Sequence, residues 1–499
     1  MMPAPVEEKK SGLTYWAARV LEECDQASAG FAADPVHDLR VAIRRCRSMA
    51  DGFLSVDPDP AWKQMKRLAK PLFSSLGELR DTQVMLEWVA KFSSPDDAVG
   101  KDLTAALLHK ESALKTAAQE ALAAFDRKQW ASLNEHLAER TGKVPPEGAV
   151  FQHLALERWM DARELHRRAL RNRSGFAWHQ LRIGIKRFRY TVENFLPERH
   201  AKWSKDLRDL QDALGEVHDF DVLRALILSH DGIHADERSR WATRIAEERR
   251  KRLDLYRRKM VGQHSLWQVW RDALPAGAEL EQAAMEKLRT WASFLDPDVM
   301  HTRLVEHLAL ELYDGLSHCG ILHSNPQSRR ILQAAALLHE VGRGRIARGQ
   351  PGRHQKRGQR LIAKLKPPLG WSEEDMRLLA VLVRYHRGAL PPPRSPALAG
   401  IDRKRRSELL CMMGVLRLAN ALDEAHRGNV HDIAVTRKDG AAWISGVGVA
   451  TLSREAERLA RARYLLETVC RRPIVIRMGR AKSPAKTSAA RPPRQAAEA

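Results

Sequence analysis

An internal repeat constrains this chain more than any other feature of its sequence. The segment HDLRVAIRRCR, which begins at His37, matches HQLRIGIKRFR, which begins at His179. Two further segments repeat in the same order, LGELRD at Leu76–Asp81 and LGEVHD at Leu214–Asp219. The two pairs are offset by 179 − 37 = 142 and 214 − 76 = 138 residues. This equal order and near-equal spacing predict a duplicated unit in the N-terminal half.

The residues of both repeats have the periodicity of amphipathic helices rich in Ala, Leu, Arg, Glu and Lys. At about 100° per residue, the basic residues of each segment fall on one helix face. The first stripe comprises His37, Arg40, Arg44 and Arg47, with Arg45 beside it, and the second comprises His179, Arg182, Lys186 and Arg189, with Arg187 beside it. The N-terminal half is therefore predicted to be all-α, with one basic stripe on each of two equivalent helices.

Two interpretations of these stripes are possible. A run of basic residues is commonly a solvated surface. A solvated face would normally mix signs at i, i+4, however, whereas cations stacked on one face repel each other unless an anion lies between them. Successive phosphates of a polyanion would meet this demand, and Arg forms bidentate hydrogen bonds with such groups. The duplication favours the second interpretation, a binding site for inorganic polyphosphate or a similar polyanion.

The overall charge agrees with an anionic partner. Lys and Arg number 84 and Asp and Glu 62, so that the formal net charge is +22 and the sequence pI is about 10.0. Nucleic acid, an acidic membrane surface and polyphosphate would each satisfy this charge, and it could also serve solubility alone. Five scattered cysteines, no signal-peptide pattern and no run of about 20 apolar residues lead us to expect a cytoplasmic protein without a membrane segment.

The repeated motifs resemble the CHAD family, the conserved histidine α-helical domain, whose members bind inorganic polyphosphate. The resemblance rests on the His-led basic rows and the Leu-Gly-x-x-Arg/His-Asp motif in both halves. It implies two four-helix bundles facing each other across a basic cavity, and it would allow association with polyphosphate granules. Further residues that could line this cavity are Lys70, Arg80, Arg208 and His218.

The C-terminal half contains residues suited to a metal. His301 opens one helical segment, His339 and Glu340 close another, and Asp423 lies in a third. Imidazole and carboxylate ligands suit one divalent ion, Mn, Mg, Zn or Fe, which could activate water for attack on a phosphate ester. The alternative is that these residues are isolated groups at helix surfaces or at the edge of the core.

These segments resemble the HD-type helical domain at the C-terminus of exopolyphosphatases and guanosine pentaphosphate phosphohydrolases. The His-Asp pair of that family is His339-Glu340 here, which weakens the prediction of a metal and still more that of a second one. In the family, phosphatase chemistry belongs to preceding ATPase-fold domains, and this chain shows no Gly-rich phosphate loop. The resemblance therefore implies polyphosphate contact by a basic surface, to which His354, Lys356, Arg357, Arg360, His386 and Arg387 could contribute.

After His426 the pattern changes to short β-like runs around the turn Lys438-Asp439-Gly440, then a helix and a last apolar run at Pro473–Arg477. We therefore expect a mainly α protein. It would comprise a duplicated four-helix-bundle domain at 5–272, an HD-type all-α domain with a small terminal β-sheet at 290–478, and a disordered basic tail at 479–499.

Three functions are compatible with these features. The favoured hypothesis is polyphosphate binding in the basic cavity, extended or regulated by the HD-like domain. The second is a metal-dependent phosphohydrolase acting on polyphosphate or a phosphorylated nucleotide, with His301, His339, Glu340 and Asp423 as ligands. The third is a basic protein associated with nucleic acid or the ribosome, although no reader motif is present. The pattern does not indicate an oligomeric state, and whether the protein is an enzyme stays open.

Overall fold

A computed structural model of the chain describes residues 12–230, 232–344, 353–392, 394–448 and 453–479. The chain divides into two compact units, each described separately below. Unit 1 ends at Phe294 and also includes Pro368–Gly370, and unit 2 comprises Leu295–Pro367 and the chain from Trp371. Gly479 ends the last strand, and the rest of the predicted basic tail lies outside the described residues.

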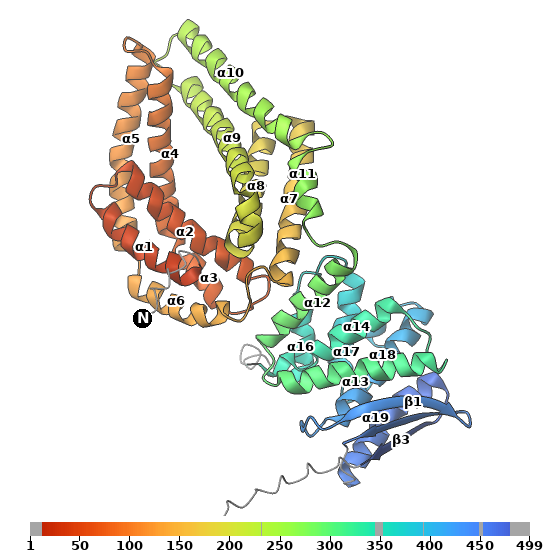
Figure 1. Ribbon diagram of the computed structural model, residues 1–499. Coiled ribbons are helices and arrows are strands. Elements are labelled where there is room, and N and C mark those ends of the chain that lie inside the picture. Colours follow the sequence, from red (N-terminus) through yellow and green to blue (C-terminus); the bar gives the residue numbers. More distant parts are fainter. Residues whose placement is uncertain (1–11, 231, 345–352, 393, 449–452, 480–499) are drawn as a thin grey trace, which may run out of the picture. The chain divides into compact units, whose positions relative to one another are not determined.

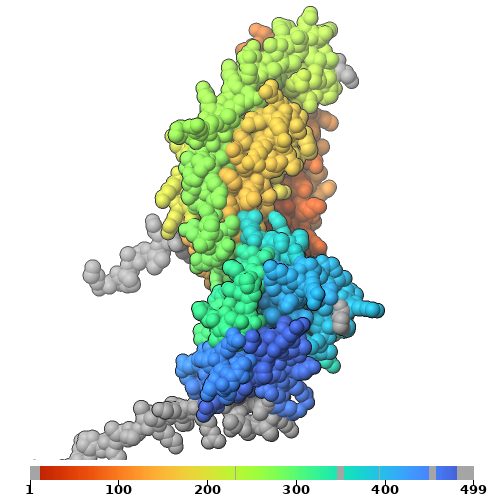
Figure 2. All heavy atoms as spheres, turned by 90° about the vertical axis from the view of Figure 1, so that its right-hand side faces the viewer, coloured from red at the N-terminus to blue at the C-terminus, as the bar shows by residue number. Residues whose placement is uncertain are grey.

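Unit 1 is built from helices. They are α1 (Leu13–Ser28), α2 (Ala33–Phe53), α3 (Ala61–Leu68), α4 (Lys70–Phe92), α5 (Ala98–Ala123), α6 (Arg127–Thr141), α7 (Ala149–Asn172), α8 (Gly175–Phe195), α9 (Pro197–Ser229), α10 (Ala235–Met260), α11 (Leu266–Asp272) and α12 (Gly277–Ser293). Figure 1 shows α4 with α5 and α9 with α10 as two long hairpins. In Figure 2, atoms of α7 (orange-yellow) lie beside those of α10 and α11 (green).

The sequence repeat corresponds to a repeat of elements, in which α2 and α4 match α8 and α9. Seven residues, 54–60, separate α2 from the short α3, whereas Leu196 alone separates α8 from the continuous α9. This longer connection accounts for the change of offset from 142 to 138 between the two pairs of motifs. Helices α2 and α4 also contact α8 and α9 across the two halves.

The core of unit 1 explains which way the stripes face. On α2, Leu39, Ile43 and Cys46 are fully buried, and on α8 their counterparts Leu181, Ile185 and Phe188 are buried as well. This i, i+4 and i, i+3 spacing forms one apolar face on each helix. The basic stripe of each helix lies on the neighbouring face, at the border of the core.

Unit 2 combines helices with a small sheet. Its elements are α13 (Val299–His318), α14 (Pro326–Leu338), η1 (Val341–Arg343), α16 (His354–Ile362), α17 (Glu373–Tyr385), η2 (Pro396–Leu398), α18 (Arg403–Leu422), β1 (His431–Lys438), β2 (Ala441–Val447), α19 (Ser453–Cys470) and β3 (Ile474–Gly479). Strands β1 and β2 are antiparallel, and β3 pairs with β2 in parallel. The prediction of a mainly α chain with a small terminal sheet is confirmed.

The turn between β1 and β2 lies where the sequence predicted it. Asp439 and Gly440 both have positive φ angles, of 50° and 74°. Two successive residues of this kind form the tight turn whose twist matches that of a hairpin, and Asp-Gly is a preferred pair there. In the described part of the chain, no helix is both long enough and apolar enough to cross a membrane.

Candidate functional site

A cavity of about 460 Å³ lies in unit 1 among α2, α4, α8 and α9. It is lined by both halves of the repeat. Of the residues that the sequence singled out, it brings together His37, Arg40, Arg44, Arg80, Arg182, Lys186 and His218. His179 lies directly behind this lining, because its Nδ1 is 3.2 Å from Nδ1 of His218.

The other predicted basic residues have different surroundings. Arg45 forms an ion pair with Glu193, and Nε of Arg189 is 3.7 Å from the same carboxylate. Arg47 donates from Nη1 to the carbonyl oxygen of Lys66, 2.9 Å away. The remaining three are exposed and do not line the cavity, namely Lys70, Arg187 and Arg208.

Several cations in the cavity form no close ion pair among the described residues. Arg44, Arg182 and Lys186 form no ion pair with any described residue, and the buried Nε of Arg182 has no hydrogen-bond partner among them. Arg40 donates only to the backbone oxygen of Phe73, at 3.1 Å. Like charges with unfilled donors in one cavity are the arrangement expected where an anion binds.

Five carboxylates also line this cavity. They are Asp81, Glu87, Asp212, Glu216 and Asp219. Glu87 accepts from Arg80 at 3.0 Å, and Glu216 pairs with Arg252. The predicted basic cavity is thus mixed in sign, because α4 and α9 add acids to the stripes of α2 and α8. Asp81 and Asp219, the final residues of the repeated Leu-Gly motifs, were expected to orient basic side chains, and no such role was expected of the other three.

The crowding of cations changes their proton affinities. Burial, together with Arg182 and Arg44, lowers the pKa of Lys186 to about 7. Burial and Arg182 lower the pKa of His218 to about 4, and burial with Arg80 and Arg44 lowers that of His37. The histidines of the cavity are therefore neutral at physiological pH, and Lys186 is close to the midpoint of its titration.

Two equivalent glycines have different surroundings. A Cβ atom on Gly77 would lie 2.8 Å from Nη1 of Arg40, so this glycine lets the guanidinium pack against α4. A Cβ atom on Gly215 would meet nothing within 4 Å, and this residue borders the cavity. Gly77 therefore positions a side chain, whereas Gly215 leaves space.

Unit 2 contains a separate buried cluster of imidazoles and carboxylates. Its members lie at or next to helix ends. His301 is in the first turn of α13, His339 follows α14, His354 starts α16, His386 follows α17 and Asp423 follows α18. Glu340 adjoins His339 and completes the cluster.

Hydrogen bonds fix the orientation of three of these imidazoles. Nδ1 of His339 donates to the carbonyl oxygen of Ala336 at 2.7 Å, and Nδ1 of His386 donates to that of Val383 at 2.8 Å. Each bond satisfies a carbonyl in the last turn of the preceding helix. Nδ1 of His301 donates to Oδ2 of Asp423 at 2.8 Å. The Nε2 atoms of His339 and His386 are therefore left as acceptors, the form in which imidazole binds a metal.

Glu340 lies at the centre of this cluster. Its Oε1 is 3.8 Å from Nε2 of His339, 3.7 Å from Nε2 of His354 and 3.8 Å from Nε2 of His386. Burial raises the pKa of Glu340 to about 7, and burial lowers the pKa of His339 to about 3 and that of His354 to about 4. The side chain of Glu340, which is longer than that of an aspartate, thus lies close to His339 as well as to His354 and His386.

Two groups of three could each hold an ion, and they share Glu340. One comprises His301, His339 and Glu340, and the other comprises Glu340, His354 and His386. Nε2 of His301 lies 3.4 Å from Nε2 of His339 and 3.3 Å from Oδ1 of Asn420, and the buried Nε2 atoms of His354 and His386 have no hydrogen-bond partner among the described residues. A cation would satisfy all four Nε2 atoms, so the residues fit a divalent metal.

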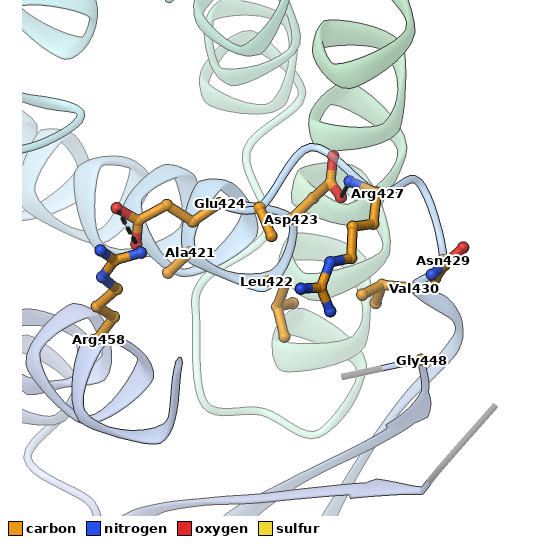
Figure 3. A pocket seen from close by; sticks show the side chains of 10 residues that line it. Ala421, Leu422, Asp423, Glu424, Arg427, Asn429, Val430, Gly448 and Arg458 are labelled. Carbon is orange, nitrogen blue, oxygen red and sulfur yellow. Dashed lines mark hydrogen bonds and ion pairs between the residues drawn. The ribbon is translucent and has the colours of Figure 1, made fainter. Parts of the chain in front are cut away.

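The predicted four-ligand set therefore differs from the arrangement in the structure. Oδ2 of Asp423 accepts from Nδ1 of His301, the ring nitrogen other than the one that lies near His339. Oδ1 of Asp423 accepts from the backbone N–H groups of Arg427 and Gly428 at 3.0 and 2.9 Å. It orients His301 and belongs to neither group. Figure 3 shows Asp423 beside a pocket of about 30 Å³, across which Glu424 pairs with Arg458.

His354 and His386 belong to the cluster, although they were predicted to contribute to a basic surface. Their basic neighbours obscured them, since Lys356 is exposed and Arg357 donates to the carbonyl oxygen of Gly342 at 2.8 Å. The available signal was that His386 lies only three residues after the end of a buried apolar run, LLAVLV at residues 378–383.

Comparisons with known proteins match the N-terminal and the C-terminal parts of the chain to two different families. Residues 14–228 match the family model of the CHAD domain, and residues 283–444 match that of the Ppx/GppA phosphatase, domain III. A crystal structure of the CHAD domain from Ricinus communis covers 53% of this chain and 93% of its own, with 21% identity and a TM-score of 0.37.

Two curated relatives share shorter segments. Bifunctional uridylyltransferase/uridylyl-removing enzymes from Rhodospirillum rubrum and Ruegeria pomeroyi are 45% identical over 60 residues and 36% identical over 76 residues. These segments represent 12% and 15% of this chain. They span only 6% and 8% of the relatives' own lengths.

Proposed function

Because a CHAD domain forms its N-terminal part and a Ppx/GppA domain III its C-terminal part, we propose that this protein binds inorganic polyphosphate in the cavity of unit 1. The two domains together indicate a polyphosphate-related function. Unit 2 would extend or regulate the binding. In this proposal, unit 1 recognises the phosphate groups, and the buried cluster of unit 2 has a separate role.

One observation carries the proposal, the convergence of Arg44, Arg182 and Lys186 from two repeats without a close ion pair to any described carboxylate. A phosphate chain supplies several closely spaced charges, and guanidinium groups hold phosphate oxygens in pairs of parallel hydrogen bonds. Arg40 and Arg80 extend the same lining. A ligand with a single charge would use only part of this set.

The test compares two variants that each remove four basic side chains. The cavity variant carries Arg40→Ala, Arg44→Ala, Arg182→Ala and Lys186→Ala. The control variant carries Arg167→Ala, Arg168→Ala, Arg171→Ala and Arg173→Ala, which are exposed on or just after α7 and do not line the cavity. Each lost hydrogen bond to a charged group is worth about 1.5–3 kcal/mol, so the cavity variant should lose at least about 100-fold in affinity.

Binding is measured by titrating polyphosphates of defined length into each protein at one salt concentration, after circular dichroism has established that both variants are helical. The control variant should retain its affinity within about threefold, because its four arginines do not line the cavity. Equal affinity of the cavity variant and the wild type would reject the cavity as the binding site.

The buried cluster of unit 2 supports a second candidate function, a metal-dependent phosphohydrolase acting on polyphosphate or a phosphorylated nucleotide. His301, His339 and Glu340 would hold one divalent ion, and Glu340, His354 and His386 another. A bound ion lowers the pKa of its water toward about 7 and so supplies a nucleophile. Asp423 keeps His301 oriented, and the hydrogen bonds to Ala336 and Val383 keep His339 and His386 in the ligand tautomer.

Metal analysis tests this second function. After reconstitution with Mn²⁺ or Zn²⁺ and removal of excess metal, the wild type should retain up to two ions per chain. His386→Ala should lose the ion of one group, and Glu340→Ala should lose both because this residue is shared. Phosphate release should fall with the metal content. A reconstituted wild type without metal or activity would exclude the hydrolytic function and leave polyphosphate binding unaffected.

A further inference from the structure

Helices α18 and α19 of unit 2 approach each other at backbone distance. A Cβ atom on Gly414 would lie 3.1 Å from Cβ and 3.2 Å from Cα of Leu466. Near one end of the contact, Glu424 is 3.4 Å from Arg458. Helices α18 and α19 are therefore antiparallel. A residue before Gly414 on α18 lies opposite a residue after Leu466 on α19.

This geometry brings two cysteines together. Cys411 lies one turn before Gly414, and Cys470 lies one turn after Leu466. The two thiols share a side-chain hydrogen bond, and both are partly exposed. Neither belongs to the metal cluster or to the cavity of unit 1, and no role described above uses them.

The two thiols differ in reactivity. The hydrogen bond from Cys411 lowers the pKa of Cys470, with a further contribution from Arg472, whereas the pKa of Cys411 is raised. The thiolate is the nucleophilic form of cysteine. Cys470 is accordingly the group that reacts first with an oxidant, and Cys411 is the neighbouring thiol that can resolve the product.

We propose that Cys411 and Cys470 form a reversible disulfide when the protein meets a peroxide. The thiolate of Cys470 attacks one peroxide oxygen, the O–O bond breaks, and sulfenic acid and hydroxide form. The sulfur of Cys411 then attacks that of Cys470 and displaces the hydroxyl group, which leaves as water with the proton of Cys411. Overall, two thiols and one hydrogen peroxide give one disulfide and two waters, and a dithiol reverses the change.

The disulfide would close a loop that contains the end of α18, strands β1 and β2, and most of α19. Asp423, which directly follows α18, and Asn420, whose Oδ1 is 3.3 Å from Nε2 of His301, belong to this loop. Oxidation therefore fixes the helix that supports His301. Cross-linking a loop of this size should raise the midpoint of thermal unfolding of unit 2 by about 5–10 °C.

The experiment treats the full-length protein with hydrogen peroxide, alkylates the remaining thiols and maps the peptides by mass spectrometry. We expect a Cys411–Cys470 peptide pair with the loss of two hydrogen atoms, which dithiothreitol reverses. Cys319→Ser is the control, because Cys319 is also partly exposed but its Sγ donates to the carbonyl oxygen of Val435 at 3.4 Å. This variant should form the same cross-link.

A second variant identifies the reacting sulfur. In Cys411→Ser, Cys470 should accumulate as sulfenic acid that dimedone traps, since no thiol is left to resolve it. The proposal is overturned if both cysteines of the wild type stay alkylatable after peroxide treatment. It is equally overturned if Cys470 is oxidised to sulfinic acid without a cross-link to Cys411. Polyphosphate binding in unit 1 is measured independently, so the two proposals can fail separately.

Discussion

Lys186 lies in the cavity with Arg44 and Arg182, and its burial beside them lowers the pKa of its ammonium group to about 7. A polyphosphate chain bound there would favour the charged form and raise this pKa. Affinity should therefore weaken as the pH increases from 6 to 9, because binding then requires uptake of a proton. Titration of a long polyphosphate across this range tests the prediction. Lys186→Arg should remove most of the dependence, since Arg stays charged; the same slope in both proteins would contradict it.

The same residue should also affect stability in the absence of ligand. Between the folded pKa of about 7 and the ordinary value of 10.5, the unfolded chain holds a proton that the folded chain has lost. The contribution of Lys186 to the free energy of unfolding should therefore increase as the pH rises through this interval. Urea denaturation of the wild type and of Lys186→Met at several pH values measures the difference, which should shrink with increasing pH as the wild-type ammonium deprotonates.

Asp423 offers a third test at the scale of the residue. Asp423→Asn should lower the affinity for a divalent ion by about 10–100-fold, because the carboxylate that orients His301 is lost while every ligand remains. Competition with a chelator measures this affinity. Asp432→Asn is a matched control, since Asp432 is exposed and forms its ion pair with the adjacent, exposed His431 rather than with a residue of the cluster. Equal losses in both variants would argue against an orienting role.

At the scale of the element, Gly77 on α4 and Gly215 on α9 are equivalent in sequence but should respond differently to alanine. Gly215→Ala places its Cβ in open space and should stabilise the fold by about 0.5–1 kcal/mol, as expected within a helix. Gly77→Ala should displace Arg40, which then loses its hydrogen bond to the carbonyl oxygen of Phe73. Polyphosphate binding should weaken about 3–10-fold as a result. Denaturation and titration of both variants check this. Equal effects would contradict it.

The sequence predicted the elements better than it predicted their neighbours. The repeat, the stripes on α2 and α8 and the hairpin turn at Asp439 all follow from periodicity and turn chemistry, which are local. The carboxylates opposite the stripes come from α4 and α9, and the approach of His354 and His386 to Glu340 depends on how helix ends meet in unit 2. Such contacts between distant segments are set by tertiary packing, and a single sequence carries little information about them.

At the scale of the whole molecule, the net charge of +22 should attract many polyanions to the exposed surface, and this surface binding should weaken steeply with salt. Duplex DNA would use exposed cations anywhere on the surface. We therefore expect the control variant of α7 to lose DNA affinity about as strongly as the cavity variant, whereas only the cavity variant loses polyphosphate affinity. Competition between the two ligands at one salt concentration measures this. DNA that bound in the cavity as tightly as polyphosphate would favour the nucleic-acid function instead.

The mixed lining of the cavity has a further consequence for how a polyanion would enter it. Six cationic side chains, two of them lysines, face five carboxylates there, so the cavity is close to electroneutral before anything binds. An incoming phosphate chain makes its surroundings negative and should carry part of its own counter-ions with it. Fewer counter-ions are then released than six cations would displace, and the slope of log K against log salt should be correspondingly shallow.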